Sequence, residues 1–175
     1  DSLRLANYLA SLSGQDVRTV AFVRDEARAD ASLIALACDE LVVGRDAVLG
    51  GPGAVVIGKS KLPDLRRSIR ALAESQHRDW SLPVALVDSS LVVHRYIRQG
   101  TNEVRYFCEE ELAAQDAPEE WQQDAEIFAG IGLSGIEAVE TQLAKQTADS
   151  FDEFRRVYAL EGDLGGGQPN WGNLL

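Results

Sequence analysis

The chain has 175 residues, and its 28 acidic and 17 basic side chains give a formal net charge of −11 at neutral pH. Phosphate binding needs a concentration of lysine and arginine, and anionic lipid attracts basic segments. The charge therefore argues against a nucleic-acid groove and against a site on an anionic membrane surface. Hydrophobic residues make up 45% of the chain and charged residues 26%, which is typical of one globular domain with a buried core.

The first part of the chain predicts alternating helices and strands. Leucines recur at helical spacing over residues 2–12, which indicates an amphipathic helix. The run 27–38 is almost wholly small and apolar, and a helix that is apolar on all sides is typically buried. Strands are expected, from their content of β-branched residues, at 18–23, 40–43 and 47–49.

A glycine-rich turn at residues 50–53 leads towards a long helix. Pro63 suits the first turn of that helix, where its missing N–H costs no hydrogen bond. The buried side of the helix is expected to comprise five apolar residues, Leu62, Leu65, Ile69, Leu72 and Ala73.

The second half of the chain begins with a predicted β-hairpin at residues 91–108, whose turn comprises residues 99–102. A short acidic helix is expected at 109–115. The polar stretch 116–124 is predicted to be a surface loop.

Two later segments, 134–137 and 150–153, have the Ser-x-x-Glu pattern of a capping box, and each is expected to open a helix. The alternation of strands and helices predicts an α/β sheet with helices on its faces, into which the 91–108 hairpin is inserted. The glycine-rich residues 165–175 are expected to form a tail or linker.

Few side chains favour a metal or cofactor site, so neither is expected. Cys38 and Cys108 lack metal-like spacing, and a disulfide between them stays open. His77 and His94 stand alone and are expected at the surface. The adjacent acids Asp39–Glu40 are expected to point apart and to cap a helix or face solvent.

Several segments resemble the NfeD branch of the ClpP-class serine proteases, in the ClpP/crotonase superfamily. They are a buried helix leading into a strand, ASLIALACDELVV, a short strand ending at glycine, DAVLG, and the later segment GIGLSGIEA. The resemblance implies a ClpP/crotonase-like domain over residues 1–164, in which 80–128 is the least typical part. It also implies that the first strand of the family fold would precede Asp1. Because the chain begins at Asp1 and has no methionine, it is expected to be an excised or processed domain.

In active members of this family, a serine at the N-terminal end of the buried helix is the nucleophile. A lysine near the start of the next long helix is its base, because a partly desolvated lysine can accept the hydroxyl proton. The resemblance places Ala29, which has no hydroxyl, at the serine position. Ser32 could take that role only if the alignment shifts by three residues, and Lys59 and Lys61 flank the expected position of the base.

The resemblance therefore predicts a degenerate peptidase domain that binds a peptide or another subunit. Gly50, Gly51 and Gly53 are expected to allow close approach of that partner to the backbone. One open alternative is an active endopeptidase for apolar peptides that uses Ser32 with Lys59 or Lys61. Another is crotonase-like acyl-thioester chemistry, which needs backbone oxyanion donors more than a nucleophile.

The resemblance also implies a homo-oligomer and a membrane-associated protein with this domain outside the bilayer, on the extracytoplasmic side. The sequence contains no apolar run of about 20 residues, so any membrane anchor is expected in segments outside this chain.

Overall fold

The computed structural model describes residues 2–12, 16–53 and 58–158, and of Lys59 only the backbone. Its central sheet is parallel, with the strand order β1-β3-β9. The strands are Val20–Val23, Glu40–Val43 and Gln146–Thr147. The central strand β3 is buried at Leu41, Val42 and Val43, and strands buried on both faces read as continuous apolar runs. The edge strand β1 is only partly buried and was predicted from its content of β-forming residues. The tail predicted at 165–175 lies outside the described residues.

A second, smaller sheet continues the first. β2 (Glu26–Ala27) pairs in parallel with β4 (Val48–Leu49), and β8 (Leu133–Ser134) pairs antiparallel with β4. The predicted helix over 27–38 was therefore wrong at its start: Ala27 belongs to β2, and helix α2 is Asp30–Leu36. Pairing with β4 places Ala27 in the strand, since its carbonyl accepts a hydrogen bond of 2.8 Å from the N–H of Gly50.

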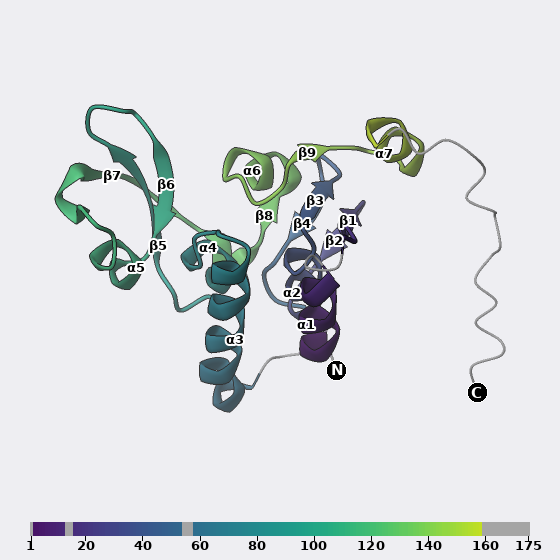
Figure 1. The fold of residues 1–175 in the computed structure, drawn as a ribbon, viewed down its shortest axis with the longest axis horizontal. Coiled ribbons are helices and arrows are strands. Elements are labelled where there is room, and N and C mark those ends of the chain that lie inside the picture. The colour runs from purple at the N-terminus through teal and green to yellow at the C-terminus, as the bar shows by residue number, and fades with distance from the viewer. Residues whose placement is uncertain (1, 13–15, 54–57, 159–175) are drawn as a thin grey trace.

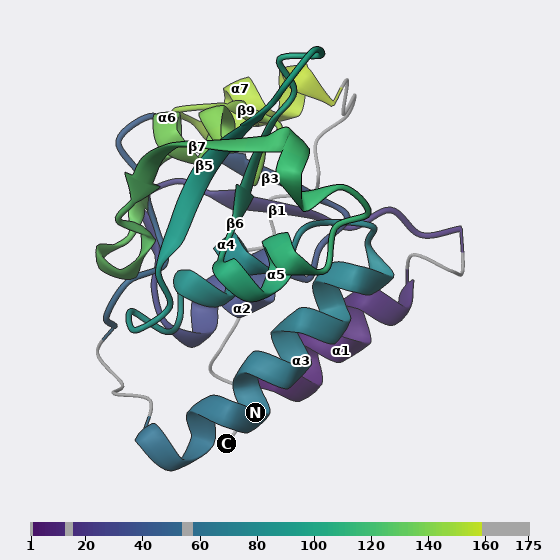
Figure 2. The ribbon, with the colours of Figure 1, turned by 90° about the vertical axis from the view of Figure 1, so that its left-hand side faces the viewer.

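Four helices pack together beside these sheets (Figures 1 and 2). They are α1 (Ser2–Leu12), α2, α3 (Leu62–Ser75, preceded by the 3₁₀ turn η2, Lys59–Lys61) and α4 (Ser81–Ala85). The helix predicted over 2–12 and the helix with Pro63 in its first turn are both confirmed. The apolar cluster between the four helices comprises Ala6, Leu33, Ala37, Ile69, Leu72, Ala73, Trp80, Val84 and Cys108.

A third sheet is antiparallel and lies to one side of the parallel strands, at the left of Figure 1. Its strand order is β6-β5-β7. β5 (Val93–Arg98) and β6 (Val104–Phe107) form the hairpin predicted at 91–108, and α5 (Glu109–Ala113) follows it.

The prediction of a surface loop at 116–124 was wrong, because this stretch contains the 3₁₀ turn η3 (Pro118–Glu120) and the start of strand β7 (Trp121–Ile127). Residues 122–126 are all exposed, so this edge strand has no buried face and no alternating pattern that would reveal it. Its pairing with β5 makes it a strand.

The last described part returns to the central sheet through η4 (Ala129–Ile131), β8, α6 (Gly135–Glu140), β9 and α7 (Phe151–Val157). The capping box predicted at 134–137 is complete. At 150–153 only half of it forms: Ser150 accepts from the N–H of Glu153, whereas the Glu153 carboxylate accepts from the N–H of Asp149. Within the described residues, no helix has both the length and the apolar character needed to cross a bilayer.

Candidate functional site

A sharp turn connects β2 to α2 at Ala29, the residue that the resemblance places at the nucleophile position. Ala29 has φ 47° and ψ −118°, a conformation that residues with a Cβ rarely adopt and that costs about 1–3 kcal/mol. The surrounding contacts hold it in place: its N–H donates to the carbonyl of Gly51 at 3.1 Å, and its side chain is buried. The turn brings a residue with no hydroxyl to the start of α2.

The glycine turn after β4 packs against this residue. Gly51 has φ 76°, and a Cβ on it would lie 2.5 Å from the carbonyl oxygen of Ile131. A Cβ on Gly53 would lie 2.9 Å from the Cβ of Ala29. Close packing within the chain thus explains why glycine is needed at both positions, and the predicted role of Gly50, Gly51 and Gly53 in binding a partner stays a prediction.

Ser32 lies one helical turn after Ala29, inside the protein. Its side chain is fully buried, and its hydroxyl donates a hydrogen bond of 2.6 Å to the carbonyl oxygen of Ala29. Lys61 is exposed at the residue before α3, and among the described side chains no hydrogen bond joins it to Ser32. The side chain of Lys59 lies outside the described part of the structure.

Asp39 and Glu40 were predicted to cap a helix or to face solvent, but both are half-buried and have partners within the protein. The Asp39 carboxylate accepts from the backbone N–H and the hydroxyl of Thr19, at 2.7 and 2.8 Å. Glu40 accepts from Lys145 at 2.8 Å and from the Tyr158 hydroxyl at 2.6 Å, and it also pairs with Arg18. Because these partners come from segments far apart in sequence, the prediction had no local signal for them.

These contacts set the pKa of Glu40. Burial alone would raise that pKa, but the hydrogen bonds from Lys145, Tyr158 and Arg18 outweigh the effect and lower it to about 2. Conversely, burial and the hydrogen bond to Glu40 raise the pKa of Tyr158 to about 12. The cluster connects Glu40 of β3 with residues just before β1 and β9 and just after α7, and sequence reasoning missed it.

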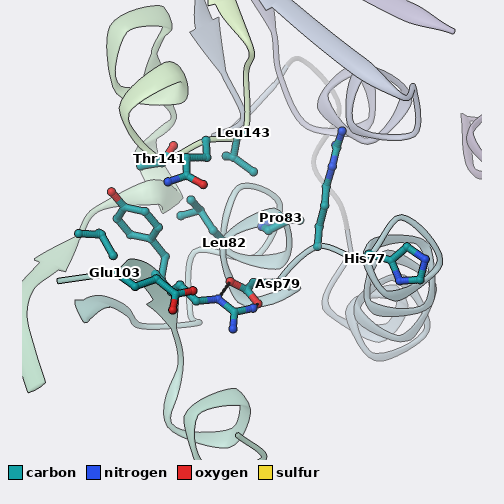
Figure 3. A pocket seen from close by; sticks show the side chains of 12 residues that line it. His77, Asp79, Leu82, Pro83, Glu103, Thr141 and Leu143 are labelled. Carbon is teal, nitrogen blue, oxygen red and sulfur yellow. Dashed lines mark hydrogen bonds and ion pairs between the residues drawn. The ribbon is translucent and has the colours of Figure 1, made fainter. Parts of the chain in front are cut away.

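A polar cleft of about 430 Å³ opens between the end of α3, α4, β6 and the segment after α6 (Figure 3). On one wall, the guanidinium of Arg105 pairs with both carboxylate oxygens of Asp79. On another, Arg78 donates to the carbonyl oxygen of Asp39 at 2.7 Å. His77 is exposed as predicted, whereas His94 is half-buried and its Nδ1 has no partner among the described residues, contrary to the predicted surface position.

Other candidate groups have structural partners. The buried carboxylate of Glu111 accepts 2.8 Å hydrogen bonds from the N–H groups of Trp80 and Ser81, although burial raises its pKa. Cys38 and Cys108 are both free and buried. Within the described ranges, no group of three or more histidine, cysteine, aspartate or glutamate side chains could hold a metal ion.

The described architecture, a parallel sheet with a second, smaller sheet and the buried helix α2, is similar to a ClpP-like protease fold. Two solved structures of the 1510-N membrane-bound stomatin-specific protease are similar to this chain, and the likeness in fold rests on the first of them. One is a lysine-to-alanine variant in complex with a substrate peptide, with a TM-score of 0.52 and 10% identity over 87% of this chain. The other is a serine-to-alanine variant, with a TM-score of 0.49 and 11% identity over 89% of this chain.

The chain spans 57% and 60% of the lengths of those two chains. At such low identity the likeness concerns the fold alone, and it supports the ClpP-like fold predicted from the sequence. No protein-family model matches the sequence, and no curated protein matches it either.

Proposed function

We propose that this chain is a catalytically inactive domain of ClpP-like fold that binds a peptide or another protein subunit. The observation that carries the proposal is the turn at Ala29. A turn of this kind presents a residue at the start of a buried helix, next to the glycine turn, and here that residue has only a methyl group. A methyl group can neither attack a carbonyl carbon nor accept a proton, so serine-type hydrolysis has no nucleophile at this position.

Ser32 is a poor substitute for the missing hydroxyl. A serine nucleophile must contact the substrate and share a hydrogen bond with its base. Ser32 is fully buried, and its hydroxyl proton is directed to a backbone carbonyl, which cannot act as a base. The active Ser–Lys endopeptidase is therefore less well supported than the inactive domain.

The structural neighbour supports a peptide as the class of ligand. The 1510-N protease of the same fold is membrane-bound and was solved with a substrate peptide. By analogy of fold, we propose a peptide or protein partner for this chain, with the glycines of residues 50–53 beside it, and an extracytoplasmic location next to a membrane. A chemical probe of the turn at Ala29 tests the proposal.

That test is labelling with a fluorophosphonate probe, which reacts with activated serines. We expect no labelling of the wild-type protein or of Ser32→Ala, in samples whose fold is verified by circular dichroism. An active ClpP-class peptidase run in parallel shows that the probe is competent. Labelling of the wild type that is lost in both Ser32→Ala and Lys61→Ala would contradict the proposal and establish a Ser–Lys peptidase.

A further inference from the structure

Strand β6 has one edge that no other strand covers. It is the outer strand of the β6-β5-β7 sheet, and the N–H of Arg98 in β5 donates to the carbonyl of Glu103. In an antiparallel pair, hydrogen-bonded and non-hydrogen-bonded residue pairs alternate. In the observed register, Arg105 and Phe107 therefore bond towards β5, whereas the N–H and C=O groups of Val104 and Tyr106 point outwards.

The next outward backbone group, the N–H of Cys108, shows that this edge faces helix α4. The N–H of Cys108 donates to the hydroxyl of Ser81, the first residue of α4, at 2.8 Å. Among the described residues, no partner is found for the outward backbone groups of Val104 and Tyr106. Residues 103–106 all line the cleft of Figure 3, so the unpaired part of the strand edge opens into it.

The cleft continues past Tyr106 into a second groove of about 760 Å³ between β7, η4 and α6. The cleft and the second groove share four lining residues, Val104, Tyr106, Thr141 and Gln142. The volume of each is in the range of sites that bind small ligands or short peptides.

The second groove is apolar and acidic. Phe128 and Ile131 both line it, with 68% and 75% of their surface exposed, so they bring two large apolar side chains to one groove. Its charged lining comprises Glu126, Glu137, Glu140 and Arg95, and the arginine is paired with Asp124. A ligand that complements this surface carries large apolar side chains and positive charge.

We propose that the free edge of β6 binds an extended peptide segment of a partner protein, which pairs through the backbone of Val104 and Tyr106 and places apolar and basic side chains along the second groove. Exposed strand edges bind peptides in this way, with affinity from main-chain hydrogen bonds and specificity from neighbouring pockets. The site is independent of the turn at Ala29, so the proposal does not rest on whether that turn is catalytic.

A second copy of this chain fits the edge less well than a basic peptide. Each copy carries a net charge of −11, and the groove itself has an excess of carboxylates, so self-pairing brings like charges together.

The probe that tests the proposal is a short fluorescein-labelled peptide of alternating valine and lysine with both ends blocked, followed by fluorescence anisotropy. We expect saturable binding to the wild-type protein. The same peptide methylated on the amide nitrogens of one strand edge, or with glutamate in place of lysine, is expected to bind about tenfold more weakly or not at all.

Variants of the protein separate the two parts of the site. Val104→Pro removes an outward N–H, which edge strands tolerate, and is expected to weaken binding about tenfold. Val104→Thr keeps the N–H and the β-branched shape and serves as the matched control. Phe128→Ser and Ile131→Ser alter exposed side chains and are expected to weaken binding several-fold.

The proposal is overturned if the valine–lysine peptide does not bind at about 1 mM, or if the methylated peptide binds as well as the unmethylated one. Self-association of the protein that Val104→Pro abolishes would also overturn it, since the occupant would then be a second copy. If Val104→Pro does not fold, comparing the methylated and unmethylated peptides on the wild-type protein still tests the proposal.

Discussion

At the scale of single residues, Ala29 has an unfavourable backbone conformation. Its positive φ of 47° brings the Cβ close to the backbone, a cost that glycine does not have. The Ala29→Gly variant is expected to raise the free energy of unfolding by about 1 kcal/mol, measured by urea denaturation. Ala35→Gly, within α2, is the control and is expected to lower it by about 1 kcal/mol. Destabilisation by both variants would mean that Ala29 is not strained.

Glu40 makes stability depend on pH. Its pKa is lowered to about 2 in the folded protein, so its contribution is complete above its ordinary pKa near 4.5 and is lost as the pH falls towards 2. Glu40→Gln is expected to lower the free energy of unfolding by about 1–3 kcal/mol at pH 7, because charge-assisted hydrogen bonds are lost. The difference from wild type is expected to shrink as the pH falls from 5 to 2.

Urea denaturation across that pH range measures this effect, with Glu119→Gln on an exposed side chain as the control. A difference between Glu40→Gln and wild type that does not change with pH would show that these partners do not lower the pKa of Glu40. Tyr158 also makes stability depend on pH, because its pKa is raised to about 12 in the folded protein. Its contribution is complete below its ordinary pKa near 10 and is lost as the pH rises towards 12.

At the scale of elements, the β6-β5-β7 sheet has an apolar centre of its own. Phe107 and Trp121 meet edge to face, with ring centroids 5.2 Å apart, and Tyr96 packs on Phe107. Trp121 is the one buried residue of β7, the strand that the sequence pattern did not reveal.

Trp121→Ala is expected to lower the free energy of unfolding by about 3–5 kcal/mol and to speed amide hydrogen exchange in β5, β6 and β7. Gln122→Ala changes the exposed neighbour in the same strand and is expected to alter stability by less than about 0.5 kcal/mol. Equal effects of the two variants would show that the aromatic cluster does not hold the sheet together.

At the scale of the whole molecule, the homo-oligomer implied by the family resemblance stays a prediction. Sedimentation equilibrium is expected to show a mass of at least twice the 19.1 kDa of the chain. Higher salt is expected to favour association, because it screens repulsion between chains of charge −11. A monomer at all concentrations and salt conditions would contradict the prediction.

The sequence alone identified the helices α1 and α3, the strands β1 and β3 and the hairpin of β5 and β6, because hydrophobic periodicity, β-branched runs and turn residues are local signals. The placement of Ala29 at the family's serine position, which the resemblance implies, stays a prediction. The sequence could not reveal β7, whose strand conformation depends on pairing with β5 rather than on its own pattern.

Only the tertiary structure decided the burial of Ser32, the low pKa of Glu40 and the free edge of β6. Each depends on contacts between segments distant in sequence: Glu40 meets Lys145 and Tyr158 across 105 and 118 residues. Solvation and hydrogen bonding at such points are set by which surfaces pack together, and a sequence pattern carries no local trace of that packing.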